Sequence, residues 1–211
     1  MALYRFRQEQ KLVVAYRELL KVLSECGYLD GTVIYPYAGP DVFPSLFAET
    51  HRLNKSRKIA YDYDGLYDFD RGKTIVHRLF KKDTPGMLEI IYKNTLGEKE
   101  LDARELKNYE KIRSQIKGPA ILFLKGFWQW SREETNSQLQ EIHNTIFREV
   151  LQKDDRIIIL DKKDLALLPR IKNAGFEIVE DYEIDIPLIG EEDDFLNIPF
   201  VLIYQSASLT L

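Results

Sequence analysis

The sequence predicts a doubly wound α/β domain built on a mostly parallel, seven-stranded sheet with an antiparallel last strand. Five short apolar runs are each followed by a helical pattern, as parallel strands joined by crossover helices require. Most of these runs lack polar alternation, which is typical of strands buried on both faces. A loop and no helix separates the last two runs, and such a connection permits an antiparallel pair.

Length, charge and cysteine content restrict the class of protein. A chain of 211 residues suits a single domain over residues 1–211. A net charge of −4 offers no basic footprint, so we do not expect nucleic acid as the main partner. One cysteine and three widely spaced histidines predict neither an internal disulfide nor a metal site. No apolar segment approaches the roughly 20 residues of a membrane span, so no membrane partner and a cytoplasmic location are expected.

The chain begins with a predicted amphipathic helix that should pack on the sheet. It covers about residues 4–26, where apolar residues recur at spacings of one, three and four. Cys26 falls on the apolar side of this helix, so we expect it to be a small core residue. Gly27 stands where a C-terminal cap belongs, and Asp30-Gly31 is a turn signal before the first buried strand, Thr32–Tyr35.

The remaining elements alternate along the chain, and the helices carry their own start signals. Capping boxes at Asp102-x-x-Glu105 and at Ser131-x-x-Glu134 open two of the helices. The other strands are expected at Lys58–Tyr61, Met87–Tyr92, Ala120–Leu124, Arg156–Leu160, Phe176–Ile186 and Pro199–Tyr204. The helices between them are expected at Val42–Thr50, Lys73–Lys82, Asp102–Lys117, Ser131–Gln152 and Leu165–Asn173.

The turn after the first strand, Tyr-Pro-Tyr-Ala-Gly-Pro-Asp at residues 35–41, is the expected ligand site. Open parallel sheets bind ligands beyond the carboxyl ends of their strands, where the winding reverses. Gly39 allows the backbone to approach a ligand closely, and the helix after Asp41 points free N–H groups at the crevice. A carboxylate at that helix start disfavours a phosphate, so a ligand without pyrophosphate is favoured.

An acid ends the second strand about twenty residues later. Asp62 could accept hydrogen bonds from two ribose hydroxyls. Asp64 is a second candidate, but Asp62 lies nearer the end of the apolar run. The alternative is that both acids belong to a solvated turn with Gly65.

Lys125 and an aromatic cluster that includes Trp128 follow the fourth strand. An aromatic cluster at a strand end could wall a small-molecule pocket, and Lys125 could supply a cation. The plainer interpretation is that Phe127 and Trp128 cover the sheet edge and that Lys125 is simply exposed.

The order of elements resembles the class I S-adenosylmethionine-dependent methyltransferases, which have a Rossmann-like sheet with the last strand antiparallel beside the sixth. The likeness covers about residues 5–206. It is carried by three segments, 32–41 at the place of the glycine-rich first motif, 59–62 ending in an acid, and 168–179 as the final helix, glycine turn and sixth strand. The chain departs from the first motif at Tyr35, where an acid is usual, and at Tyr37 and Asp41, where glycines are common.

The resemblance implies S-adenosylmethionine as cofactor and an unidentified small molecule as methyl acceptor. It assigns cofactor contacts to Tyr37, Ala38, Gly39, Asp41 and Asp62, with Asp62 on the ribose, and substrate contacts to Lys125 and Trp128. No general base is identified, so no catalytic residue is assigned.

Two interpretations of the altered first motif stay open. Tyr35 and Tyr37 could form one wall of a reshaped pocket, since a tyrosine face can stack on a purine or a sulfonium. They could equally fill the site, and the protein would then be a catalytically inactive methyltransferase-fold module for binding or assembly. A dehydrogenase-type Rossmann protein is disfavoured because GxGxxG is absent, and the motifs of common hydrolases, ATPases and zinc peptidases are absent too.

Overall fold

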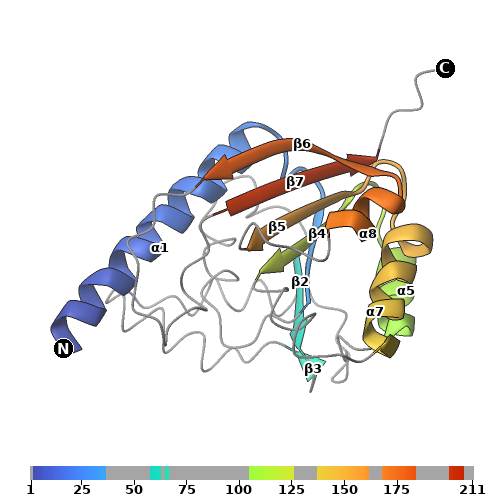
Figure 1. The fold of residues 1–211 in the computed structure, drawn as a ribbon, viewed down its shortest axis with the longest axis horizontal. Helices are drawn as coiled ribbons and strands as arrows, with labels where there is room; N and C mark the ends of the chain where they lie inside the picture. Colours follow the sequence, from blue (N-terminus) through green and yellow to red (C-terminus); the bar gives the residue numbers. More distant parts are fainter. Residues whose placement is uncertain are drawn as a thin grey trace.

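The computed structural model describes residues 2–36, 58–62, 65–66, 105–125, 137–161, 168–183 and 200–206. Within these residues, a mixed sheet has the strand order β3-β2-β1-β4-β5-β7-β6, with helices on either side (Figure 1). The strands are β1 Thr32–Tyr35, β2 Lys58–Asp62, β3 Gly65–Leu66, β4 Ala120–Lys125, β5 Arg156–Asp161, β6 Phe176–Glu183 and β7 Phe200–Ser206. The helices are α1 Ala2–Glu25, α5 Leu106–Ser114, α7 Ser137–Thr145 and α8 Leu168–Asn173, and α7 continues into the π-helical turn η1 Ile146–Val150.

The centre of the sheet is parallel and one outer side is antiparallel. The strands β2, β1, β4 and β5 run in the same direction. The last strand, β7, lies between β5 and β6 and is antiparallel to both. The predicted antiparallel last strand is therefore confirmed, and its place beside the sixth strand is the one that the resemblance implies.

The third strand that the structure describes was not expected from the sequence, and the strand that was expected next is not tested. The predicted strand Met87–Tyr92 lies outside the described residues, as do the predicted helices Val42–Thr50 and Lys73–Lys82. The described third strand is β3, which pairs antiparallel with β2 through Asp62↔Gly65 and Tyr61↔Leu66. The sequence predicted only a turn here, because a strand of two residues leaves no hydrophobic pattern.

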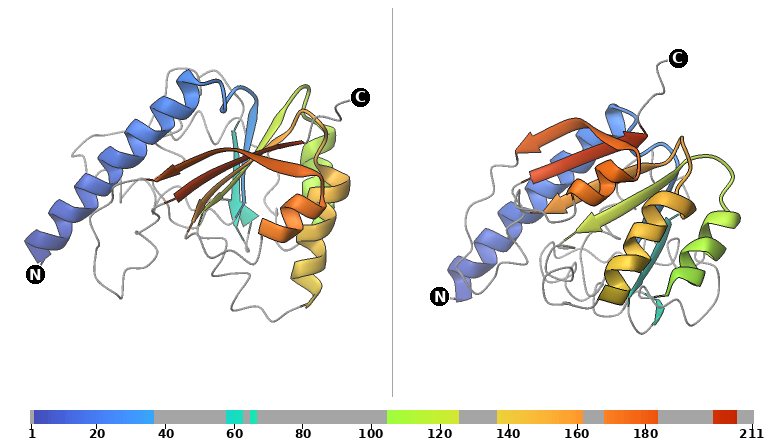
Figure 2. Two further views of the ribbon diagram at one scale, coloured as in Figure 1. Left: turned by 45° about the horizontal axis from the view of Figure 1, so that its top comes forward. Right: turned by 45° about the vertical axis from the view of Figure 1, so that its right-hand side comes forward.

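Helices cover both faces of the sheet, as the two views of Figure 2 show. Alternate residues of β4, such as Leu122 and Leu124, join a core cluster with α5, η1 and α8 on one face. On the other side, α1 buries Tyr16 and Leu20. This helix occupies the region where the sequence predicts one over about residues 4–26. None of the described helices is long and apolar enough to cross a membrane.

Two expectations about helix ends are wrong. Cys26 is exposed, because α1 ends at Glu25 and the chain turns away at Gly27, whose φ is +76°. The capping box at residues 102–105 also fails, since α5 begins only at Leu106. Glu105 is the residue that precedes this helix, in an extended conformation and without a side-chain cap hydrogen bond, so it does not lie in the first turn.

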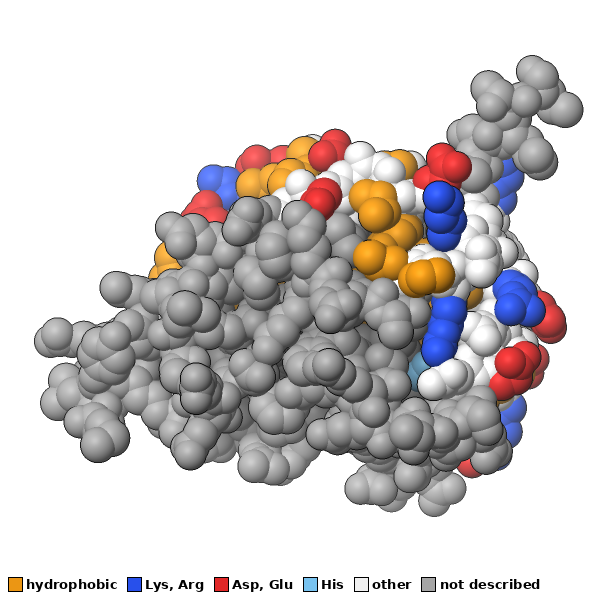
Figure 3. All heavy atoms as spheres, in the orientation of Figure 1, with side chains coloured by type: hydrophobic (Ala, Val, Ile, Leu, Met, Phe, Trp, Pro, Cys, Tyr) orange, Lys and Arg blue, Asp and Glu red, His pale blue; other side chains and the backbone are white. Residues whose placement is uncertain are grey.

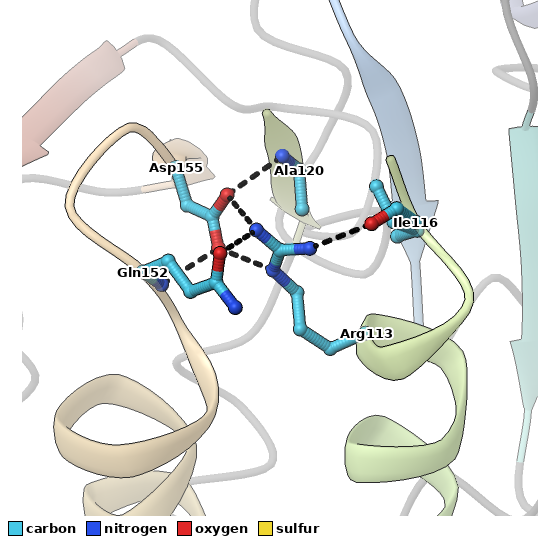
Figure 4. A network of polar contacts seen from close by, with 5 residues as sticks. All are labelled: Arg113, Ile116, Ala120, Gln152 and Asp155. Carbon is cyan, nitrogen blue, oxygen red and sulfur yellow. Dashed lines mark hydrogen bonds and ion pairs between the residues drawn. The ribbon is translucent and has the colours of Figure 1, made fainter. Parts of the chain in front are cut away.

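A buried ion pair joins three segments at the amino-terminal edge of the sheet (Figure 4). The Arg113 guanidinium on α5 donates to both carboxylate oxygens of Asp155, at 2.8 and 3.1 Å. The same carboxylate accepts the backbone N–H of Ala120, where β4 begins, at 2.7 Å and that of Gln152 at 2.8 Å. Arg113 also donates to the carbonyl of Ile116 at 3.2 Å. The pair therefore fixes the end of α5 and the start of β4 against the turn that leads into β5.

Candidate functional site

At the carboxyl edge of the parallel sheet, β1 ends before the strands on either side of it, and this stagger of strand ends is called the notch below. Tyr35, the last residue of β1, is level with Ala60 of β2, and β2 continues for two more residues to Asp62. On the other side, Ile34 is level with Leu122, so β4 also continues two residues beyond Tyr35, to Lys125. Two residues add roughly 6.6 Å to each flanking strand, and two strand spacings separate those strands by about 10 Å. The backbones of β2 and β4 therefore extend beyond the end of β1 on its two sides, to Asp62 and Lys125.

This notch lies where the winding of the sheet reverses. The next strand after β1 in the described chain is β2 on one side, and the chain later returns to place β4 on the other side of β1. Connections on the two sides of such a point leave the edge in opposite directions and open a crevice between them, which is where open α/β sheets bind ligands. The location expected from the sequence and the observed strand order agree.

The residue that ends β1 at the notch is aromatic and buried. Tyr35 is 2% exposed, and its ring meets that of Phe123 edge-to-face, with 5.3 Å between the centroids and an interplanar angle of 88°. This geometry is the favourable one for two aromatic rings. Pro36, which follows, is also buried. At the position where the first motif usually carries an acid, this chain therefore has a phenol packed against the neighbouring strand.

The predicted site residues divide into two groups. Asp62 is the last residue of β2 and Lys125 is the last residue of β4. Their backbones therefore reach the carboxyl edge of the sheet on opposite sides of β1. The residues predicted in the turn and in the aromatic cluster lie outside the described part of the chain; they are Tyr37, Ala38, Gly39, Asp41 and Trp128. The two strand ends are thus brought to one edge, and the contacts predicted for the other five remain predictions.

A third charged residue ends a strand at the same edge. Asp161 is the last residue of β5, and its predecessor, Leu160, is level with Lys125. In the sequence, Asp161 is simply the acid that follows the apolar run 157–160, and no functional role is predicted for it. The signal that could have identified Asp161 is that the neighbouring strands β4 and β5 both end in charged residues. This signal can be recognised only when the strand order is known.

The buried histidine on α7 is a poor candidate for a general base. His143 is 4% exposed, and its burial, followed by the charge of Arg170, lowers its pKa to about 3. A base with so low a pKa holds no proton at neutral pH and accepts one reluctantly. Among the described residues, no group of three or more His, Cys, Asp or Glu side chains could hold a metal ion.

Known proteins resemble the chain in shape and hardly in sequence. No family model matches the chain, and no curated protein matches it. A solved S-adenosylmethionine-dependent methyltransferase from Anabaena variabilis is 15% identical, with a TM-score of 0.47, over 90% of this chain and 84% of that chain. The glycopeptide N-methyltransferase MtfA is 10% identical, with a TM-score of 0.48, over 90% of this chain and 94% of that chain. At these identities and TM-scores, the choice of site rests on the strand order and register alone.

Proposed function

We propose that the notch at β1 binds S-adenosylmethionine and that the protein is a methyltransferase acting on a small molecule. One observation carries this proposal. The strand order β3-β2-β1-β4-β5-β7-β6, with β7 antiparallel, reverses its winding at β1, and the strands on either side of β1 end at Asp62 and Lys125. A site of this kind suits a nucleoside ligand, and the expected carboxylate at the next helix start disfavours a pyrophosphate.

Within this proposal, the strand ends take different parts of the ligands. Asp62 is assigned to the ribose hydroxyls, since a carboxylate can accept two hydrogen bonds. The cofactor's amino-acid part is assigned to residues 37–41, and the acceptor molecule to Lys125 and Trp128. The methyl group of a sulfonium is already electrophilic, so the protein mainly aligns a nucleophile with it and removes water. The cytoplasmic location and the absence of a nucleic-acid partner stay predictions.

A second candidate function is a binding or assembly module that has lost catalysis. The observation that favours it is the buried Tyr35, which packs on Phe123 where an acid is usual. An acid at that position could accept hydrogen bonds from a polar ligand. The Tyr35 ring is instead buried against Phe123 and is part of the core. The two candidates differ in whether bound cofactor is turned over.

Ligand-induced stabilisation tests the cofactor assignment. With Kd near 10 μM, 1 mM S-adenosylmethionine or S-adenosylhomocysteine should stabilise the fold by about 2.7 kcal/mol, measured as a rise in thermal midpoint. Asp62→Ala should remove most of this rise. Asp154→Ala is the matched control, because Asp154 is an exposed acid in the turn before β5, at the opposite edge of the sheet. No rise with either compound would exclude the cofactor.

Turnover separates the two functions. Protein that shows the thermal rise should transfer labelled methyl from S-adenosylmethionine to a compound in a small-molecule extract. Binding without transfer to any acceptor would favour the non-catalytic module. If Asp62→Ala shows the same ligand-induced rise in thermal midpoint as the unaltered protein, Asp62 is not the ribose ligand. The assignment of the cofactor would then still stand.

A further inference from the structure

A cavity lies between α8 and the outer strands β6 and β7. Its volume is about 550 Å³, within the range of pockets that hold small molecules. The described residues that line it are Leu168, Pro169, Lys172, Phe176, Glu177, Ile178 and Tyr204. Six of these come from α8 and the first residues of β6, and Tyr204 comes from β7.

This cavity is separate from the notch at β1. In the sheet, β6 is the outermost strand beyond β7 and β5, so two strands lie between it and β4. Because β5 and β6 are both antiparallel to β7, they run in the same direction. The cavity lies at the start of β6, hence towards the opposite edge from the carboxyl ends that flank the notch. A ligand here would not occupy the proposed cofactor site.

The walls of the cavity are mainly apolar and partly open to solvent. Phe176 is 4% exposed and belongs to the core, whereas Ile178 is 49% exposed. Figure 3 shows hydrophobic side chains gathered on the surface around α8, with basic side chains beside them. Exposed large apolar side chains beside a cavity are typical of a surface that something covers. Lys172 and Glu177 are both exposed and carry one charge of each sign. Together they favour neither a cationic nor an anionic ligand.

One polar group in this apolar wall has no partner. Tyr204 is 1% exposed, and its hydroxyl is buried without a hydrogen bond among the described residues. A buried hydroxyl without a partner costs free energy. Because this hydroxyl is not itself exposed to the cavity, a ligand acceptor recovers that cost when the tyrosine ring shifts towards the cavity. Burial, followed by the charge of Asp181, raises the pKa of this phenol, so the hydroxyl keeps its proton and can donate it.

We propose that the cavity between α8, β6 and β7 binds a small, neutral aromatic compound that carries a hydrogen-bond acceptor for the Tyr204 hydroxyl. The apolar walls take the ring system, and the single buried donor fixes its orientation. A neutral ligand fits because the two rim charges are opposite. This site does not depend on the proposed methyltransferase function.

Quinoline and naphthalene are suitable probes, because they have nearly the same shape and only quinoline has a ring nitrogen that accepts a hydrogen bond. Titrations followed by protein NMR at pH 7.5 should show saturable shifts at α8 and at the start of β6. Quinoline should bind at least fivefold more tightly than naphthalene. Tyr204→Phe keeps the ring and removes the donor, so it should abolish this preference and leave naphthalene binding unchanged.

A second variant tests the location without depending on the buried tyrosine. Ile178→Asp places a charge at the mouth of the cavity and should weaken both probes. Val14→Asp is its matched control, because Val14 is 50% exposed on α1, on the other side of the sheet. The proposal is overturned if neither probe gives a saturable shift, if Tyr204→Phe keeps the preference for quinoline, or if Ile178→Asp binds both probes like Val14→Asp.

Discussion

His143 shows how the burial of a single side chain sets a pH dependence. It is a basic group on α7 whose pKa falls to about 3 in the folded protein, from an ordinary value of 6.5, mainly because burial disfavours the charged form. The unfolded chain takes up this proton below pH 6.5, whereas the folded chain does not until about pH 3. Proton uptake therefore favours the unfolded state throughout that window.

We predict that His143 makes the protein acid-sensitive between pH 6.5 and pH 3. The contribution of His143 is complete above pH 6.5 and is lost progressively as the pH falls, by several kcal/mol at most. His143→Gln cannot take up a proton, so its free energy of unfolding should fall less between pH 7 and pH 4.5. Urea unfolding of both proteins at several pH values measures this difference. Parallel losses in the two proteins would contradict the prediction.

The turn between α1 and β1 depends on a residue without a side chain. Gly31 has φ +152°, and a Cβ there would lie 2.5 Å from the carbonyl oxygen of Pro119. The same carbonyl accepts the backbone N–H of Thr32 at 3.0 Å, so this contact begins the alignment of β1 with β4. The starts of β1 and β4 are thus held together by a close approach of two backbone segments.

Gly31→Ala should destabilise the protein more than Gly118→Ala does. Both glycines have positive φ, but a Cβ at Gly118 would meet nothing within 4 Å. Backbone strain alone should cost Gly118→Ala roughly 1–2 kcal/mol. Gly31→Ala adds a backbone clash and should cost at least about twice as much, measured by chemical unfolding. Equal losses would show that the turn moves to accept the methyl group.

At the scale of the whole molecule, the Arg113–Asp155 pair connects elements that are distant in sequence. The side chains of this pair are 8% and 0% exposed, so each depends on the other for neutralisation. Removing one partner leaves a buried charge, which typically costs 3–5 kcal/mol. The pair lies at the opposite edge of the sheet from the proposed cofactor site, so its loss should act on stability without direct contact with the ligand.

Arg113→Ala should therefore lower the free energy of unfolding by about 3–5 kcal/mol. The matched control is Lys107→Ala, which breaks the ion pair between Lys107, in the first turn of α5, and Glu105, the residue that precedes this helix. The side chains of this pair are 74% and 45% exposed. An exposed pair contributes at most about 1 kcal/mol. Denaturant unfolding compares the two variants, and similar losses would mean that burial adds nothing to the Arg113 pair.

The sequence predicts the centre of the fold well, because short continuous apolar runs such as 120–124 and 157–160, rich in isoleucine and leucine, favour strands buried on both faces. It predicts the edges poorly. The hairpin strand β3 has two residues and no pattern, and the start of α5 depends on packing more than on an Asp102 cap. The Arg113–Asp155 pair joins residues 42 positions apart, which no local motif reveals.

For the candidate site, the sequence predicts the strands that surround it, while the site itself stays a prediction. The position of the turn after β1 follows from the strand order, and Asp62 and Lys125 do end the flanking strands. The buried contact of Tyr35 with Phe123 was not predictable, because it depends on the register between β1 and β4. Asp161 was missed because its neighbour across the sheet comes from a strand more than thirty residues earlier.

The insertion of β7 between β5 and β6 imposes an order on folding during synthesis. A ribosome releases β6 before β7, yet β6 has no partner in the described sheet other than β7. Until residues 200–206 emerge, β6 cannot join the sheet, and the cavity lacks Tyr204. The parallel centre can form earlier, since domains acquire structure as their segments appear. The nascent protein therefore assembles the edge of the proposed cofactor site first and the cavity beside α8 last.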